Sequence, residues 1–230
     1  MRLEALLLFG ALCVCACAGS NSAPHSPEQA RAEAEVGERL DAAAHLLRAV
    51  GKKVPATVAV DAECAVILPA VVHGGIILGA RYGRGFAVCK TDDGVSAPAP
   101  VSLTGGSAGI AVGFESADVL LLFTNDEGKN ALLKGHFALG ADVSVAAGPL
   151  GVGSTSNRNA DVLTYSRSRG LFAGAELSGA SLQPDDSATT ALYGSPQTFD
   201  RILSGEIKVP KRAQDFVDAI EAAIEIAQGR

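Results

Sequence analysis

Three side chains that could bind an anion alternate along one short segment: Tyr165, Arg167 and Arg169. Serines separate them, so in an extended strand all three would lie on one face. Guanidinium groups bind phosphate oxygens bidentately and tyrosine favours the wet edge of a bilayer, so this stripe suits phospholipid head groups. A second, looser set of the same composition is Arg81, Tyr82 and Arg84. For both sets the alternative is a solvated strand face with cross-strand ion pairs.

Nucleophilic chemistry has one candidate, Ser107. The sequence Gly105-Gly-Ser-Ala-Gly109 matches the G-x-S-x-G elbow of serine hydrolases, and Asp126 and His136 follow in hydrolase order. An elbow needs a helix directly after the serine, whereas residues 110–114 are strand-like and interrupted by glycine. The acid and the base also lie too close in sequence for that fold. We therefore predict no catalytic residues, with a serine esterase as an alternative.

Other kinds of site are not supported by the sequence. The glycine runs lack the Gly-Lys-Ser/Thr of a phosphate loop, and His73 and His136 have no second metal ligand at a working spacing. The net charge of -6 argues against nucleic acid and against strong general attraction to anionic lipid. We expect no cofactor, no metal and no nucleic-acid partner.

The beginning of the chain has the layout of a bacterial lipoprotein signal. Arg2 precedes an apolar run from Ala5 to Ala16, which is too short to span a bilayer. Cys17 follows a small residue, as in a lipobox, and is the candidate for a lipidated, palmitate-bearing N-terminus. We predict a signal peptide over 1–16, a lipidated tether over 17–25 and a folded domain over 26–230. An ordinary signal peptide that leaves a soluble periplasmic protein is the alternative.

The residues after Cys17 bear on location. Neither Ala18 nor Gly19 is an aspartate, so the lipoprotein rules known for enteric bacteria would direct the protein to the outer membrane, facing the periplasm. Beyond the signal region the cysteines are Cys64 and Cys89, an even count for an oxidising compartment. The sequence does not distinguish a disulfide between Cys64 and Cys89 from two separate buried thiols.

Helical patterns near both ends of the chain flank a central region whose sequence is typical of β-strands. Ser26-Pro-Glu-Gln29 is a capping box, and an apolar stripe at helical spacing follows it up to Gly51. Pro210 opens a C-terminal helix with a second apolar stripe, and residues 126–133 predict a short helix between strands at 119–124 and 141–147. With 26 glycines and 48% apolar residues, we predict one α+β domain. Its centre would be an antiparallel β-sheet or small β-barrel, flanked by an N-terminal and a C-terminal helix.

The apolar run 65–80 predicts two buried strands joined by a turn, because Pro69 and Gly74-Gly75 interrupt it. Several glycines in this region are odd-numbered and would share one strand face: Gly75, Gly79, Gly83 and Gly85, with Gly109 and Gly113 in the next glycine-rich strand. Glycines in a row let another layer approach the backbone closely. We expect helix-on-sheet contact there, with a groove for a lipid chain as the alternative.

The order of residues from Tyr165 to Gly194 resembles the C-terminal signature of the SYLF family of lipid-binding domains. The matching residues are Tyr165, Ser166, Ser168, Arg169, Gly170, Leu171, Phe172, Gly174, Gly179, Asp185, Asp186, Tyr193 and Gly194. The likeness continues upstream in the glycine-laced segments 74–85, 105–109 and 139–151.

The resemblance implies lipid binding without catalysis. Phosphoinositides are associated with eukaryotic members and are scarce in most bacteria, so the ligand implied here is another anionic phospholipid or an acyl chain. The same domain is known for actin binding in yeast cortical patch proteins, a partner that an exported bacterial protein does not meet. The alternative is a structural or protein-interaction lipoprotein of the cell envelope, with an unknown protein partner.

Overall fold

The computed structural model describes residues 26–50, 53–75, 78–108, 113–149, 160–168, 171–174, 177 and 179–229. In this part of the chain the helices are α1 (Pro27–Val50), α2 (Ala56–Asp61), α3 (Asp126–Leu133), α4 (Asp186–Tyr193), α5 (Phe199–Leu203), the 3-10 helix η1 (Lys211–Ala213) and α6 (Gln214–Ala227). The strands are β1 (Cys64–Gly75), β2 (Leu78–Thr91), β3 (Gly94–Val95), β4 (Ala99–Ala108), β5 (Gly113–Phe123), β6 (Phe137–Ala138), β7 (Val145–Ala147), β8 (Val162–Ser168), β9 (Leu171–Gly174) and β10 (Ala180–Pro184).

The strands form one sheet in the order β6-β10-β4-β2-β1-β5-β8-β7, with β3 beside β2 and β9 beside β8. The predicted α+β class with terminal helices is confirmed. The sheet is mixed, however, because β7 pairs with β8 in parallel while the other pairs are antiparallel. A parallel neighbour needs a long connection, and the segment from Ala147 to Val162 is long enough to provide it.

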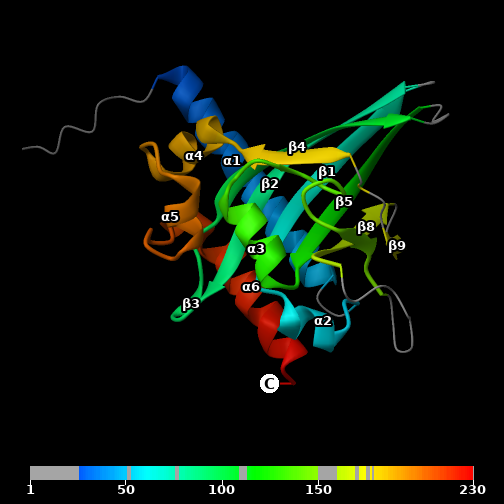
Figure 1. Cartoon of the computed structure of the whole chain (residues 1–230). Coiled ribbons are helices and arrows are strands. Elements are labelled where there is room, and N and C mark those ends of the chain that lie inside the picture. Colours follow the sequence, from blue (N-terminus) through cyan, green and yellow to red (C-terminus); the bar gives the residue numbers. More distant parts are fainter. Residues whose placement is uncertain are drawn as a thin grey trace, which may run out of the picture.

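The order of the strands forces the sheet to curl. β6 and β7 stand at opposite ends of that order, yet only residues 139–144 separate them in the chain. A flat sheet would hold these two strands about 34 Å apart, because neighbouring strands are about 4.8 Å apart. An extended chain from Ala138 to Val145 reaches only about 25 Å. The sheet is therefore bent into a half-barrel (Figure 1).

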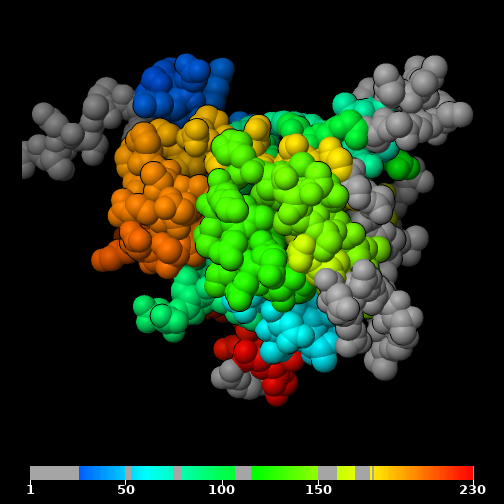
Figure 2. Space-filling model, viewed as in Figure 1, coloured from blue at the N-terminus to red at the C-terminus, as the bar shows by residue number. Residues whose placement is uncertain are grey.

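Both faces of the sheet are covered, so its strands alternate between two hydrophobic cores. In β5, the residues of the core beside α1 are Leu120 and Leu122, and those of the core on the opposite side are Val119, Leu121 and Phe123. We call these two sides the α1 face and the opposite face. The opposite face is closed partly by the segment around α3, which covers the front of the molecule between α5 (orange) and α2 (cyan) in Figure 2.

α1 begins where the capping box predicts. Ser26 Oγ accepts a hydrogen bond from Gln29 N at 3.2 Å, and Gln29 Oε1 accepts one from Ser26 N at 2.9 Å. The predicted apolar stripe, which includes Val36, Leu40 and Ala43, is buried. α4 and α6 pack beside α1 on the same face of the sheet. The prediction of a C-terminal helix after Pro210 is also confirmed.

β1 contains a bulge that explains the glycines of β2. The register of β1 shifts between Ile67 and Val72, and Ala70 within the bulge has a φ of 55°. A Cβ on Gly85 would lie 1.9 Å from the carbonyl oxygen of Ile67, and one on Gly83 would lie 2.7 Å from Val71 Cγ2. These glycines therefore accommodate the neighbouring strand. The expectation of a helix or a lipid chain against them is wrong for both positions, and Gly109 lies outside the described residues.

Candidate functional site

Tyr165 is fully buried, so the expectation that it faces a bilayer is wrong. Its ring lies against the backbone of Gly148, where a Cβ would come within 2.1 Å of the ring carbon Cζ. The hydroxyl oxygen is buried and has no hydrogen-bond partner in the described part of the chain. Burial raises the pKa of Tyr165 to about 12. Strand alternation predicts that Tyr165 and Arg167 lie on the same side of β8. It does not predict that the backbone at Gly148 covers the ring of Tyr165.

Arg167 lies on the same strand, two residues further on. Its Nε is 3.2 Å from Oδ2 of Asp118, which stands opposite it in β5. Asp118 Oδ1 also accepts a hydrogen bond from Ala70 N in the β1 bulge, at 3.1 Å. Arg167 therefore forms a cross-strand ion pair that helps to hold the bulge. Arg169 lies outside the described residues.

The second cationic set places one arginine in a network. Arg84 Nε is 2.7 Å from Asp185 Oδ2, and Arg84 Nη1 is 3.5 Å from Glu35 Oε1 of α1. Asp185 also caps α4, because its Oδ1 accepts a hydrogen bond from Ala188 N at 3.0 Å. Burial is the largest single influence and disfavours the charge on both partners, but their mutual hydrogen bond and the other hydrogen bonds and charges around them together outweigh it. The pKa of Arg84 is raised and the pKa of Asp185 is lowered.

Arg39 of α1, which no sequence pattern singled out, completes this network. Its Nη2 lies 3.6 Å from Glu35 Oε1, so one carboxylate oxygen faces both arginines. The Arg39 side chain is only 12% exposed, and its Nη1 is buried without a hydrogen-bond partner among the described residues. Burial and the charge of Arg84 lower the pKa of Arg39, although a guanidinium remains protonated in proteins. A buried N–H without an acceptor is rare, and an anionic oxygen would satisfy it.

The surface beside the Arg39–Arg84 pair is apolar. Tyr82 shares the α1 face of β2 with Arg84 and is 52% exposed, and Val72, opposite it in β1, is 43% exposed. Tyr82 stands two positions before Arg84 on this face of the strand, which places its ring beside the arginine pair. Arg81 is the neighbour of Tyr82 in the strand and therefore lies on the opposite face. The three residues Arg81, Tyr82 and Arg84 thus do not share one surface.

Ser107 lies inside a strand. It belongs to β4, where it pairs with Gly79 of β2, and the next described element is another strand, β5. A nucleophile elbow instead lies at a turn from a strand into a helix. The backbone around Ser107 therefore differs from that of the serine esterase alternative.

The described residues contain no metal-binding cluster and no membrane-spanning helix. No group of three or more His, Cys, Asp or Glu side chains there could hold a metal ion. No helix in the same residues is long and apolar enough to cross a membrane. His136, which follows α3, is exposed.

Cys64 and Cys89 stand opposite each other in β1 and β2 and are joined by a disulfide. Their Cα atoms are 4.0 Å apart, well inside the limit of about 7 Å for such a bridge. Cys17 lies outside the described residues.

Comparison with known proteins now adds to this geometry. A family model described as Ysc84, Las17-binding protein actin regulator, matches residues 104–223. The chain is 34% identical over 160 residues to Protein YSC84 of Saccharomyces cerevisiae, a match that covers 66% of this chain and 34% of that protein. It is 33% identical over 180 residues to the human SH3 domain-containing YSC84-like protein 1, covering 76% of this chain and 52% of that protein.

The chain thus spans about a third of the yeast protein and about half of the human one. The family model covers β4 to α6, which includes Asp185 but not the arginines at 39 and 84. The residues that the family model matches include the motifs quoted above from the glycines of β4 to the Tyr-Gly at the end of α4. The chain therefore belongs to the Ysc84 family, the family of the SYLF domain.

Proposed function

We propose that the protein is a non-catalytic, lipid-anchored protein of the cell envelope that binds the phosphate-bearing head groups of membrane phospholipids. One observation carries this proposal: the adjacent arginines Arg39 and Arg84, with a buried and unpartnered N–H, lie beside the exposed side chains of Tyr82 and Val72. The proposed site is therefore not on β8, where the sequence predicted it, because Tyr165 is buried there and Arg167 is paired with Asp118.

A phosphate group suits this arrangement better than the carboxylate now in it. Glu35 Oε1 is 3.6 Å from Arg39 and 3.5 Å from Arg84, longer than the 2.7–2.9 Å of a strong charge-assisted hydrogen bond. The Glu35 side chain is 63% exposed, so it can move aside at little cost. A phosphate in its place would accept hydrogen bonds from both guanidinium groups, including Nη1 of Arg39.

Tyr82 and Val72 give the same surface a second contact with a bilayer. A tyrosine ring places its apolar body toward the acyl region and its hydroxyl toward water. Charge alone would not hold the protein at a membrane, because the chain has a net charge of -6. We therefore infer that specific phosphate contacts and a small apolar contact act together.

The anchor would keep this surface close to lipid. A tether over 17–25 extends at most about 3.5 Å per residue, so the folded part would lie within about 30 Å of the membrane. Arg39 follows the first residue of α1 by 12 positions, or about 18 Å along the helix. Lipidation at Cys17 and a place at the outer membrane, facing the periplasm, belong to this proposal.

Liposome flotation of residues 18–230 tests the site. This part of the chain lacks Cys17 and the apolar run from Ala5 to Ala16, so neither its own lipid nor the predicted signal peptide provides the attachment. We expect it to float with phosphatidylcholine vesicles that contain phosphatidylglycerol, and less well as salt rises. Arg39→Gln removes charge-assisted contacts of roughly 1.5–3 kcal/mol and should weaken binding at least tenfold. Glu35→Gln removes the competing carboxylate and should strengthen it.

Arg48→Gln is the matched control. Arg48 is also on α1 and also bonds a carboxylate, Asp215 Oδ1 at 2.6 Å, but at the other end of the helix. This variant should float like the parent. Equal flotation of the Arg39→Gln and Arg48→Gln variants, both folded, would remove the Arg39–Arg84 pair from the proposal.

Protein binding is the second candidate, because the matching family model is described as a Las17-binding protein actin regulator. If the protein binds a protein partner and not lipid, it would not float with these vesicles, and crosslinking in the cell envelope would recover the partner instead. The serine esterase alternative is tested by labelling with an activated phosphonate. A non-catalytic protein should leave Ser107 unlabelled.

A further inference from the structure

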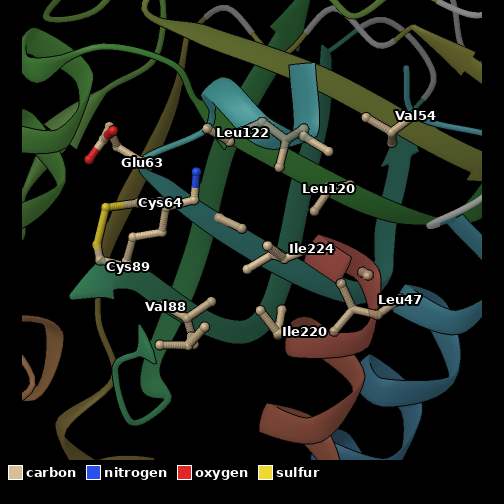
Figure 3. A pocket seen from close by; sticks show the side chains of 16 residues that line it. Leu47, Val54, Glu63, Cys64, Val88, Cys89, Leu120, Leu122, Ile220 and Ile224 are labelled. Atoms are coloured by element: carbon tan, nitrogen blue, oxygen red, sulfur yellow. A yellow bond between two sulfur atoms is a disulfide. The ribbon is translucent and has the colours of Figure 1, made fainter. Parts of the chain in front are cut away.

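A separate apolar pocket lies at the other end of α1. α1, α2 and α6 form its walls together with the α1 face of the sheet. The side chains that matter most are Leu47, Val88, Leu120, Leu122, Ile220 and Ile224, which face one another across the pocket in Figure 3. Leu47 follows Arg39 by eight residues, about 12 Å along the helix, so the pocket and the arginine pair are distinct sites.

The space is large enough for several methylene groups of a flexible apolar chain. The cavity has a volume of about 80 Å3. A cavity needs roughly 10–15 Å3 to hold one water molecule, so this one exceeds the size of a single small molecule. The walls are almost entirely aliphatic, and ordered water requires polar partners. The preferred occupant is therefore hydrocarbon.

The two ionisable side chains that line the pocket differ in their partners. Glu63 Oε2 is 3.2 Å from Lys129 Nζ, so its charge is balanced. Lys90 Nζ donates a hydrogen bond to the carbonyl oxygen of Val60, and no carboxylate of the described residues lies within 4 Å of it. Lys90 is also partly exposed. An anionic group could bind Lys90 at the water boundary while an attached chain enters the pocket.

We propose that this pocket binds a single acyl chain whose carboxylate or phosphate is held by Lys90. The inference does not depend on the arginine site, because the residues of the two sites do not overlap. The Cys64–Cys89 disulfide forms part of the pocket wall and fixes the edge from which Lys90 projects. The ligand could be a free fatty acid or the tail of a single-chain phospholipid, which share this chemistry.

Displacement of cis-parinaric acid, a fluorescent fatty acid, tests the pocket in residues 18–230, which lack Cys17 and the apolar run from Ala5 to Ala16. Binding should saturate at one probe per chain. Ala223→Phe places a ring in the pocket and should weaken binding at least tenfold. The matched control is Ala222→Phe, because Ala222 is the exposed neighbour on the same helix and should not affect the probe. Ala59→Leu, on the opposite wall, is a milder blocking variant for use if Ala223→Phe does not fold.

Competitors identify the head group and the source of the chain. Palmitate and 1-palmitoyl lysophosphatidic acid should both displace the probe, and the stronger of them indicates the natural source. Lys90→Gln should weaken palmitate several-fold but leave the uncharged hexadecanol unchanged. Probe binding that does not saturate, or that survives both blocking variants in folded protein, would overturn the proposal. Neither result bears on flotation through Arg39.

Discussion

At the scale of single residues, a buried tyrosine and a partly buried one show what a hydrogen bond contributes to a tyrosine hydroxyl. The hydroxyl of Tyr193 donates to the carbonyl oxygen of Pro98 at 2.8 Å, whereas that of Tyr165 has no partner among the described residues. Removing an unsatisfied buried hydroxyl relieves a penalty of about 1–3 kcal/mol. We expect Tyr165→Phe to raise the free energy of unfolding by about 1 kcal/mol and Tyr193→Phe to lower it by roughly 0.5–1.5 kcal/mol.

Urea unfolding at constant m-value measures both changes. If Tyr165→Phe loses as much stability as Tyr193→Phe, the Tyr165 hydroxyl has an acceptor after all.

Asp185 predicts a pH dependence. Its pKa is lowered in the folded protein, because the Arg84 hydrogen bond, the Ala188 N–H and the Ser187 hydroxyl outweigh the effect of burial. The stabilisation is therefore complete above the unfolded-state pKa of about 3.9 and is lost as pH falls through the lower folded-state value. Asp185→Asn should cost roughly 1.5–3 kcal/mol at pH 7, and the difference from the parent should shrink below about pH 4.

Unfolding free energies measured between pH 3 and pH 7 check this expectation. The control is Asp186→Asn, since Asp186 is the exposed neighbour in the first turn of α4. A loss in Asp185→Asn that stays constant down to pH 3 would contradict the assignment.

The candidate site shows what a sequence can reveal about single residues. The sequence-based grouping of Arg81, Tyr82 and Arg84 is only partly right, because alternation along β2 places Tyr82 and Arg84 on one face and Arg81 on the other. Arg39 is missed because Glu35 stands four positions before it, which is the ordinary pattern of a solvent-exposed helix pair. Only the packing of α1 against β2 and α4 buries that arginine. The prediction that Tyr165 is exposed fails for a related reason. Alternation shows which side chains share a face of a strand, but not which face another segment of the chain will cover.

At the scale of elements, the bulge in β1 determines what β2 can contain. A Cβ on Gly85 would overlap the carbonyl oxygen of Ile67, which is backbone and cannot rotate away. Gly85→Ala should therefore lower the free energy of unfolding by about 1–3 kcal/mol, as overpacking does. Gly106→Ala in β4 is the matched control, because a Cβ there meets its nearest atom at 4.0 Å.

Thermal unfolding of both variants distinguishes them. Equal melting temperatures for the parent, Gly85→Ala and Gly106→Ala would mean that the bulge can shift freely.

Elements with local signals were predictable. The capping box gives the start of α1, Pro210 gives the start of the C-terminal helical segment, and residues 126–133 form α3 as expected. The strand expected at 141–147 is shorter, β7 beginning only at Val145, because a turn at 139–144 occupies its first part. Neither this turn nor the parallel pairing of β7 has a local signature. Both depend on the distance that the chain must cross between the two ends of the sheet.

At the scale of the whole molecule, the anchor can be tested apart from the fold. If Cys17 carries the lipid, Cys17→Ala should abolish acyl labelling and membrane fractionation, since stable attachment requires the acyl chains. Cys13→Ala and Cys15→Ala are the controls and should keep both. An acylated Cys17→Ala protein in the membrane fraction would show that another cysteine is used.

The position of α1 between the later helices has a consequence for how the chain folds. Two of its polar contacts are made last: Arg48 bonds Asp215, 167 residues away, and Arg212 bonds the carbonyl oxygen of Glu33, 179 residues away. Although β1, β2 and α4 also pack against α1, its apolar stripe is therefore not fully covered until α6 has left the ribosome. Such distant contacts slow folding and expose the chain to aggregation and to chaperones. If the chain is exported, as proposed above, this delay would keep it unfolded and able to pass through a membrane pore before its core closes.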